Sequence, residues 1–511
     1  MVSKFRYPNH GYIHTLFFKV MRKHVPGFRK LPMAEQYQLC DMVNKSQHPR
    51  YKHKRHEGAT AFWYKEITSR FGRGRFDKIN STAKIFDVSL NWSKEKGETR
   101  AYKPSRNTEN ALSWYHKLVL RAERQEQGQL VAHTGRTLRT PPAPIASKAI
   151  NGHTAKNCTD APIQSFTPIN TPNLRRYIKA LETIIKQHED PDYTQGELFA
   201  DQPGMTLTDR DIGKIRYRTR FAVRVIGDSY IDLHQDTVLL HQYVEHSTGR
   251  LYARGSINLQ TVPREIRQTA LTGFYDYDME NCHYALFDQL AAKAEYQTTA
   301  ITNYLVNKKA IRAELANATA RPLKAIKQCL IAIMYGTRKT AFASEYHTAA
   351  LPDYLGEDAA HKFIHHPFVE ALFEDVRAGS KAIIEHQAKT NRHNFTNAMG
   401  YTISSNEDPK KIIAHLLQGL EAKILEIARI DQGMNIILLQ HDGFTCHQKI
   451  NRKRLSGLVR DQIGYEIAFS EELLQVPENL FPSGEVIPNR ETIDYVVKSI
   501  TYDDFSSFPV S

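Results

Sequence analysis

Cysteine is scarce in this chain, with five residues in 511 and no C-x-x-C pair. This usage argues against a thiolate zinc site or a disulfide framework and is typical of a reducing compartment. No run of 18 apolar residues occurs, and the opening stretch, "MVSKFRYPNHGYIH", lacks the apolar core of a signal peptide. We therefore expect a cytoplasmic protein with no membrane partner.

Acidic residues are scarce in the first 150 positions, where 11 Asp and Glu stand against 29 Lys and Arg, a balance of +18. The rest of the chain has a balance of −4. Such a local excess indicates a polyanionic partner, and the alternative is a basic face that only aids solubility. Aromatic residues interleave the charge in "HPRYKHKRHEGATAFWYKE" and "SRFGRGRFDK", which suits stacking on single strands. We predict a nucleic-acid-binding domain over residues 1–127.

The apolar pattern predicts a helix-rich α+β fold. Periodicity of 3.6 predicts helices over residues 12–25 and 110–125, and alternation predicts a strand over residues 81–93. Residues 128–173 are rich in Pro, Thr, Asn and Ala and are predicted to form a linker. Helices and short strands alternate from residue 174 onward.

Two acids alternate with aromatic residues in "FYDYDM", so Asp276 and Asp278 are predicted to share one face of a strand. The following "NCHYALFDQLAAKA" is predicted to be a helix. A carboxylate where a strand ends and a helix begins is well placed to hold Mg²⁺, which prefers carboxylate oxygen and leaves room for substrate phosphates. The alternative is a polar strand edge.

A basic helix is predicted in "RPLKAIKQCLIAIMYGTRKTAF". Three cations recur there at a spacing of three residues: Arg321, Lys324 and Lys327. Apolar residues fill the other side, and Tyr335 and Gly336 follow. Such a helix can hold a triphosphate with the tyrosine beside the base or sugar, or it is an ordinary basic amphipathic helix.

Two further stretches carry polar residues at turns. "ILLQHDGFTC" places His441 and Asp442 between an apolar strand and a glycine, where a carboxylate is costly to desolvate unless a metal or cation compensates it. The long amphipathic helix before it carries His415 and Gln418. "STGRLYARGSINLQTVPREIRQ" places Arg250 after a glycine and ends in extended form before a proline.

Together, the order Gly-Arg, Asn-Leu-Gln, Asp, Lys-x7-Tyr-Gly, Gln-Gly, His-Asp resembles the polymerase core shared by family A DNA polymerases and phage-type single-subunit RNA polymerases. The resemblance covers about residues 205–470. It implies a right-hand polymerase fold behind a separate basic N-terminal domain. The implied regions are a thumb-like region over 174–247, a palm over 248–300 and 390–511, and fingers over 301–389.

The resemblance also implies roles for the residues above. Asp278 and Asp442 correspond to the two metal-binding aspartates, with Asp276 as a competing candidate, and two Mg²⁺ (or Mn²⁺) ions would serve an in-line displacement. The fingers helix would bind nucleoside triphosphate: Lys327 as the catalytic contact, Lys324 or Arg321 assisting, and Tyr335 and Gly336 near the new base pair. The residues implied to contact the primer–template are Arg250, Gln418 and His441.

Some motifs favour RNA as the product and others favour DNA. Family A enzymes carry a glutamate five residues after the first aspartate to exclude the ribose 2′-hydroxyl. This chain has His283 five residues after Asp278 and Asn281 five residues after Asp276. His415 lies close to where RNA polymerases place a histidine that contacts this hydroxyl. "NLQTVPREIR" and "QGLEAK" instead look like DNA polymerases. The fingers arginine expected four residues before Lys327 is missing, and Leu323 stands in its place.

We therefore expect a compact phage- or mobile-element-type RNA polymerase or primase of a bacterial or phage-infected cell, acting on a nucleic-acid template and product strand. The first alternative is a family A-like DNA polymerase without proofreading, since the basic region shows no Asp-x-Glu exonuclease signature. The second is an inactive polymerase fold that only binds nucleic acid; paired metal ligands argue against it, because binding alone does not need them.

Overall fold

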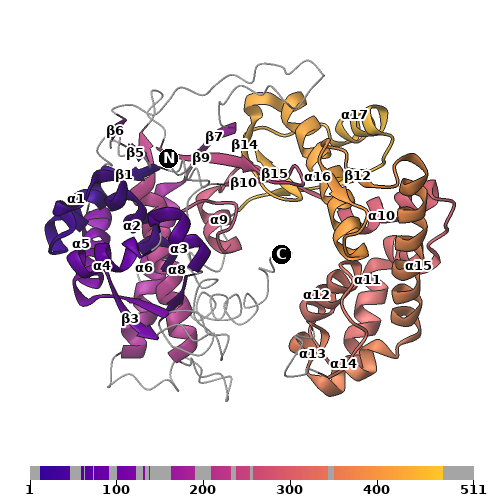
Figure 1. Ribbon diagram of the computed structural model, residues 1–511, viewed down its shortest axis with the longest axis horizontal. Coiled ribbons are helices and arrows are strands. Elements are labelled where there is room, and N and C mark those ends of the chain that lie inside the picture. Colours follow the sequence, from indigo (N-terminus) through magenta and orange to yellow (C-terminus); the bar gives the residue numbers. More distant parts are fainter. Residues whose placement is uncertain are drawn as a thin grey trace.

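The structure is a computed structural model that describes these residues: 12–46, 59–62, 64–72, 74–90, 101–121, 130–132, 137–138, 163–189, 209–231, 237–253, 257–342 and 350–475. Among them, helices predominate over short antiparallel strands, which confirms the helix-rich α+β prediction. A four-stranded sheet lies between two groups of helices, left and right of it in Figure 1. None of the described helices has the length and apolar character needed to cross a membrane.

The N-terminal part combines short helices with two small sheets, ordered β2-β4-β3 and β1-β5-β6. Its elements are β1 (Tyr12–His14), α1 (Thr15–His24), η1 (Phe28–Lys30), α2 (Met33–Ser46), β2 (Thr60–Ala61), α3 (Tyr64–Phe71), α4 (Arg75–Ala83), β3 (Phe86–Leu90), β4 (Ala101–Pro104), α5 (Arg106–Arg121), β5 (Leu130–Ala132) and β6 (Thr137–Leu138). Between α1 and η1 the chain turns at Gly27 with φ of 77°, where a Cβ would overlap the carbonyl oxygen of Thr82. Only glycine fits this turn.

The next part pairs two long helices with a further sheet of four strands, ordered β10-β9-β7, in which β8 also pairs with β9. Its elements are β7 (Ile163–Pro168), α6 (Thr171–Glu189), α8 (Asp209–Asp228), β8 (Tyr230–Ile231), β9 (Thr237–Glu245), β10 (Leu251–Ala253) and α9 (Arg264–Ala270). β7 pairs with β9 along its whole length. This sheet joins the N-terminal helices to the central sheet, because the Thr167 hydroxyl donates to the Ile437 carbonyl at 2.6 Å.

The central sheet has the order β14-β15-β11-β16 and is antiparallel throughout. Its elements, with the helices beside it, are β11 (Tyr275–Met279), α10 (Cys282–Lys293), α16 (Pro409–Gln432), η3 (Gly433–Asn435), β14 (Ile436–Leu439), β15 (Gly443–Cys446), α17 (Arg452–Ile463) and β16 (Phe469–Leu473). Asp408 caps α16 by accepting from the Lys410 amide at 2.9 Å, so this helix begins at a defined residue.

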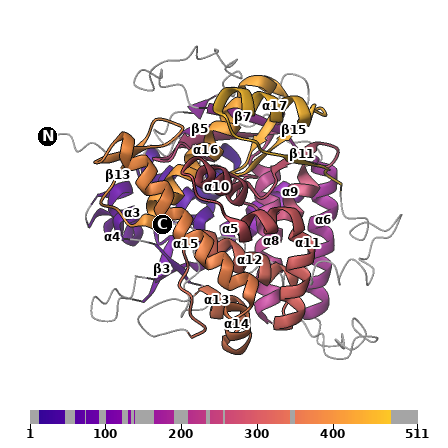
Figure 2. The same cartoon turned by 90° about the vertical axis from the view of Figure 1, so that its right-hand side faces the viewer.

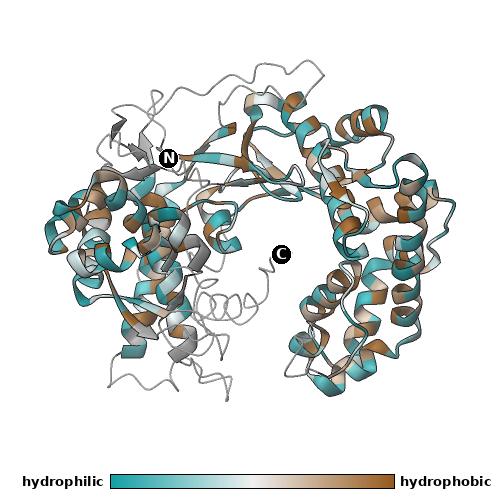
Figure 3. Ribbon diagram, viewed as in Figure 1, coloured by the Kyte–Doolittle hydropathy of each residue, from teal (hydrophilic) through white to brown (hydrophobic). Residues whose placement is uncertain are grey.

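The second group of helices, seen from outside in Figure 2, completes the described chain. Its elements are α11 (Thr299–Thr319), α12 (Leu323–Met334), α13 (Ala350–Leu355), α14 (Glu357–Ile364), α15 (Pro367–Thr390), β12 (Asn394–Thr396) and β13 (Thr402–Ser404). Apolar and polar positions alternate along these helices (Figure 3), as expected for helices that bury one side.

Two large apolar cores hold these parts together. The first runs from Phe17 and Tyr115 in the N-terminal part, through α6 and α8, to Ile437 and Leu438 of the central sheet. The second joins the other side of the sheet, including Tyr277, to the helices α10–α17. The basic N-terminal part therefore shares an apolar core with α6, α8 and one side of the central sheet.

The predicted helices and strand occur within a few residues of their expected bounds, as α1, α5 and β3. The linker prediction over residues 128–173 is too long, because β5, β6 and β7 lie inside it. Short strands containing Ser, Thr and Pro give little apolar signal, and pairing with distant strands is what defines them. β9 likewise stands at the end of the region 174–247, which was expected to be helical.

The aromatic residues predicted to stack on single strands are buried where they are described. Phe71 and Phe76 are 4% and 2% exposed, and their rings lie 5.2 Å apart. Phe62 is also in the core. Residues 47–58 and Trp63, which belong to the same prediction, lie outside the described residues. Alternation of charged and aromatic residues here reflects helices with one buried side.

Candidate active site

Two acids that are distant in sequence meet at one end of the central sheet. Asp278 pairs in register with Gly443, and the Met279 amide donates to the Asp442 carbonyl at 2.8 Å. A Cβ on Gly443 would overlap the carbonyl oxygen of Tyr277, so glycine lets β15 lie this close to β11. Asp442 is the last residue of the turn between β14 and β15, and the close pairing at Gly443 therefore brings this acid beside Asp278.

The charges at this end of the sheet act on one another. Asp278 faces solvent on β11, yet desolvation by the surrounding protein, followed by the charge of Asp442, raises its pKa to about 7. The charge of Lys327 acts in the opposite direction and lowers this pKa. Asp278, Asp442 and Lys327 thus interact electrostatically at one site, where additional positive charge would stabilise the two carboxylates.

Asp276 lies on the same face of β11, as predicted, but its carboxylate is engaged inside the sheet. Its Oδ1 accepts from Gln440 Nε2 at 2.7 Å and from Thr445 Oγ1 at 2.6 Å. Burial raises the pKa of Asp276, while the charge of Arg267 lowers it. Asp278, whose carboxylate faces solvent, is the better placed of the two to hold an ion.

A buried network of four side chains lies next to the acids. Glu421, in the middle of α16 and 1% exposed, accepts from Arg250 Nη2 at 2.6 Å and from His283 Nε2 at 2.5 Å. The Tyr335 hydroxyl at the end of α12 bonds to His283 Nδ1. With Nε2–H donating to the glutamate, Nδ1 accepts from the tyrosine. Four separate segments are thereby tied together.

The charge of this network is balanced internally. Burial acts to raise the pKa of Glu421, but Arg250 and His283 together hold it below its usual value. Glu421 is therefore an anion, and its Arg250 partner is 12% exposed at the side chain. The network fixes the orientation of Tyr335 relative to the sheet.

Three groups in this region have ligand atoms within 4.8 Å of one another: Cys282, His283 and Glu421. A metal ion there would stand beside the Arg250 guanidinium, which already neutralises the carboxylate. Burial also raises the pKa of the Cys282 thiol, which disfavours the thiolate that binds metals. The carboxylates of Asp278 and Asp442 fit Mg²⁺ better, since this ion prefers hard oxygen ligands.

α12 begins at Leu323, so Lys324 and Lys327 lie on the predicted basic helix and Arg321 precedes it. Arg321 and Lys327 are exposed, Lys324 is half-buried, and Gly336 adopts a φ of 71° just after Tyr335. Ile331, one turn after Lys327, is 43% exposed. The exposed, apolar Ile331 side chain thus lies between Lys327 and Tyr335 along the helix.

Three other predicted residues lie at different depths. His441 precedes Asp442 in the chain, and the centroid of its ring lies 4.6 Å from that of the Tyr252 ring. Gln418 and His415 are buried within α16, at 7% and 6% exposed. His415 Nε2 lies 3.0 Å from the Tyr401 carbonyl, and burial lowers its pKa. The structure therefore does not bring these two α16 side chains to an open surface beside the acids.

Sequence reasoning missed Glu421 as a site residue and treated His283 only as a missing glutamate. One signal was present: Glu421 interrupts an apolar run, "LLQGLEAKIL", and an acid at a buried helical position requires a partner. Arg267, whose charge acts on Asp276 and Asp278, was also missed.

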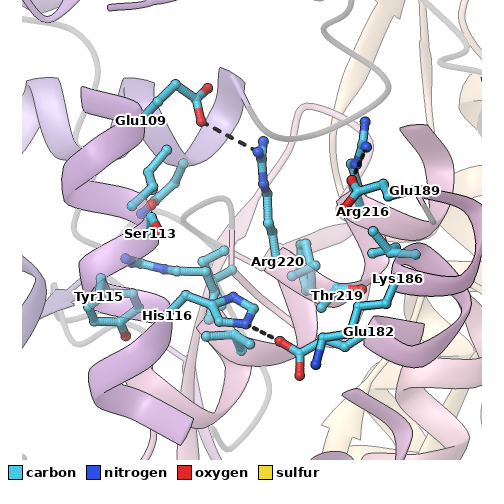
Figure 4. Close-up of a pocket in the computed structure, with 17 residues that line it drawn as sticks. Glu109, Ser113, Tyr115, His116, Glu182, Lys186, Glu189, Arg216, Thr219 and Arg220 are labelled. Atoms are coloured by element: carbon cyan, nitrogen blue, oxygen red, sulfur yellow. Dashed lines mark hydrogen bonds and ion pairs between the residues drawn. The ribbon is translucent and has the colours of Figure 1, made fainter. Parts of the chain in front are cut away.

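A cavity of about 410 Å³ lies elsewhere, among α5, α6 and α8 (Figure 4). Its acids are paired with neighbouring basic side chains: Glu109 with Arg220 at 3.4 Å, Glu182 with His116 at 2.7 Å, and Glu189 with Arg216 at 2.5 Å. The metal-site candidates are not among its lining residues. This cavity is separate from the site described above.

No protein-family model matches the chain, and no curated protein matches it. Any function assigned to the site must therefore be argued from its geometry and chemistry.

The raised pKa of Asp278 gives a pH prediction. Without divalent cations, the free energy of unfolding should fall as the pH rises from about 4 to about 7, because folded Asp278 keeps a proton that the unfolded chain has released. Mg²⁺ should reduce this fall by taking the proton's place. Urea unfolding across this pH range measures the slope. Asp278→Asn, which cannot ionise, should have a shallower slope than the parent, and equal slopes would contradict the prediction.

Proposed function

We propose that the chain is a template-directed nucleotidyltransferase in which Asp278 and Asp442 hold two Mg²⁺ ions. The observation that carries the proposal is the meeting of these two carboxylates at one end of adjacent strands, with Lys327 within electrostatic reach. Paired divalent ions supply activation of an attacking 3′-hydroxyl and stabilisation of the leaving pyrophosphate. The charge of Asp442 raises the pKa of Asp278, so the two carboxylates repel each other when no cation is bound.

The surrounding residues suit a nucleoside triphosphate. Lys327 on α12 and Arg321, two residues before the helix begins, offer positive charge to the phosphates, and Lys327 would donate a proton to the departing pyrophosphate. Exposed Ile331 offers apolar contact to a base. Tyr335, held through His283 and Glu421, provides a fixed ring at the end of the same helix. In this proposal β11, β14 and β15 belong to the palm and α12 to the fingers.

The proposed product is RNA, made by a compact phage- or mobile-element-type polymerase or primase. DNA is the second candidate, and one observation favours it. His415, the sequence's main argument for a ribose contact, is buried and bonded to the Tyr401 carbonyl. His283 meanwhile bonds to the Tyr335 hydroxyl, and in this proposal its ring would lie beside the incoming sugar.

Primer extension tests the function and the product together. The full chain is incubated with Mg²⁺ and a primed template, in parallel reactions with NTPs or dNTPs. The proposal expects Mg²⁺-dependent extension with NTPs, and a second reaction without primer tests whether synthesis starts de novo. Extension with dNTPs alone would support the DNA alternative. Incorporation of neither substrate would contradict the proposal and leave a nucleic-acid-binding module.

A further inference from the structure

The α5 helix presents two different faces. One face lines the cavity of Figure 4 through Leu112, Ser113 and His116, where His116 pairs with Glu182. The opposite face carries Trp114 and Lys117, one helical turn apart, and is exposed. Trp114 is 47% exposed, which is unusual for the largest apolar side chain on a well-packed helix.

The end of α1 completes this exposed face. The His24 ring stacks on the Trp114 indole with centroids 5.5 Å apart and planes 16° from parallel. Lys117 Nζ lies 5.9 Å from the same indole. Together with exposed Lys23 and Leu118, these residues form what is called here the Trp114 surface: Lys23, His24, Trp114, Lys117 and Leu118.

The charge on the Trp114 surface is of one sign. α1 contains no acid, and the one acid of α5, Glu109, pairs with Arg220 on the cavity side. Within the described chain, neither Lys23 nor Lys117 forms an ion pair. Nearby Arg29 and Lys30 of η1 are exposed as well. An exposed aromatic ring can stack on a flat apolar group, and the cations beside it can pair with anions. This combination suits a polyanion that carries flat apolar groups.

We propose that the Trp114 surface binds single-stranded nucleic acid, with a base stacked on Trp114 and adjacent phosphates contacted by Lys23 and Lys117. Single strands fit because their bases are free to stack, whereas duplex bases already stack on their neighbours. This inference rests on the proposed function, because a templated enzyme must bind the unpaired template strand, and the Trp114 surface would serve that purpose. The aromatic residues that the sequence suggested for this task, Phe71 and Phe76, are buried, and Trp114 is exposed instead.

Fluorescence anisotropy with the full chain and a labelled 20-nucleotide oligothymidylate, in EDTA and without nucleotides, tests the inference. Trp114→Ala should weaken binding roughly 5- to 100-fold. Trp114→Phe should keep most of the affinity because it can still stack, while Trp114→Leu, apolar but not aromatic, should behave as Ala does. An unchanged midpoint of thermal unfolding would show that these variants are folded.

A second set of variants removes one positive charge at a time. Lys117→Gln should lower affinity and reduce the slope of log affinity against log salt by about 0.7. Lys381→Gln, which removes an exposed lysine of α15 in the other group of helices, is the matched control and should change neither. Oligouridylate in place of oligothymidylate distinguishes RNA from DNA as the strand that binds more tightly.

Three results would overturn the inference: parental affinity in Trp114→Ala, parental affinity in Trp114→Leu, or equal affinity for a duplex of the same length. Because the assay contains neither metal nor nucleotide, it measures the affinity of the Trp114 surface for single strands independently of catalysis. Failure of primer extension with intact Trp114-dependent binding would refute the proposed function alone. Normal extension with Trp114-independent binding would refute only the inference.

Discussion

Asp442→Asn is expected to slow nucleotide addition by at least about 10²-fold, because loss of even one electrostatic contact to a transition state has such an effect. The substitution keeps the size of the side chain but removes a negative charge that Mg²⁺ requires. Affinity for primed template should stay within about twofold, since that affinity depends on cations elsewhere. Single-turnover primer extension and anisotropy, measured on the same preparations, provide the two values.

Asp276→Asn is the matched control for this prediction. Asp276 Oδ1 accepts from Gln440 and Thr445, and an asparagine oxygen can accept both bonds. The rate of addition should therefore remain within about tenfold of the parent, well above that of Asp442→Asn. A greater loss in Asp276→Asn than in Asp442→Asn would mean that the ion-binding pair has been assigned to the wrong acid of β11.

Glu421→Leu is expected to lower the free energy of unfolding by about 3–5 kcal/mol, the range for breaking a buried ion pair by removal of one partner. The substitution leaves the Arg250 guanidinium buried beside an apolar group and removes the acceptor of His283. Tyr335 then loses its fixed partner, so nucleotide addition should also slow. Urea unfolding of the full chain measures the stability, with Mg²⁺ absent.

Two further variants separate this effect from a general weakness of α16. Glu426→Leu removes an acid from a more exposed pair with Lys423 on the same helix and should cost less than about 1 kcal/mol. Adding Arg250→Met to Glu421→Leu removes the stranded cation and should recover part of the stability. If Glu421→Leu were no more costly than Glu426→Leu, the network would contribute little to the fold.

The local features of the site could be predicted from the sequence. Alternation placed Asp276 and Asp278 on one face of a strand, and the apolar run before Asp442 indicated a second strand with an acid at its turn. Their meeting could not be derived from periodicity, because it depends on the pairing of β11 with β15 across more than 160 residues. Only the resemblance of the motif order suggested it.

The choice between Asp276 and Asp278 could not be made from sequence, since both satisfy the same alternation. Hydrogen bonds from Gln440 and Thr445, which come from distant positions, distinguish the two acids. The Glu421 network depends in the same way on four segments that meet only in the folded chain. In the basic N-terminal part, the sequence shows the positive charge and the aromatic residues. It does not show which rings are exposed, because that depends on how the helices pack.

Metal binding tests the central claim most directly. Titration of the nucleotide-free protein with Mn²⁺, followed by the electron paramagnetic resonance signal of the free ion, measures the affinity of the acid pair. Asp278→Asn and Asp442→Asn should each weaken binding by at least about tenfold, since even partners of metal ligands have effects of 10- to 100-fold. Asp276→Asn should bind nearly as the parent does. Equal Mn²⁺ affinity in the parent, Asp278→Asn and Asp442→Asn would contradict the account.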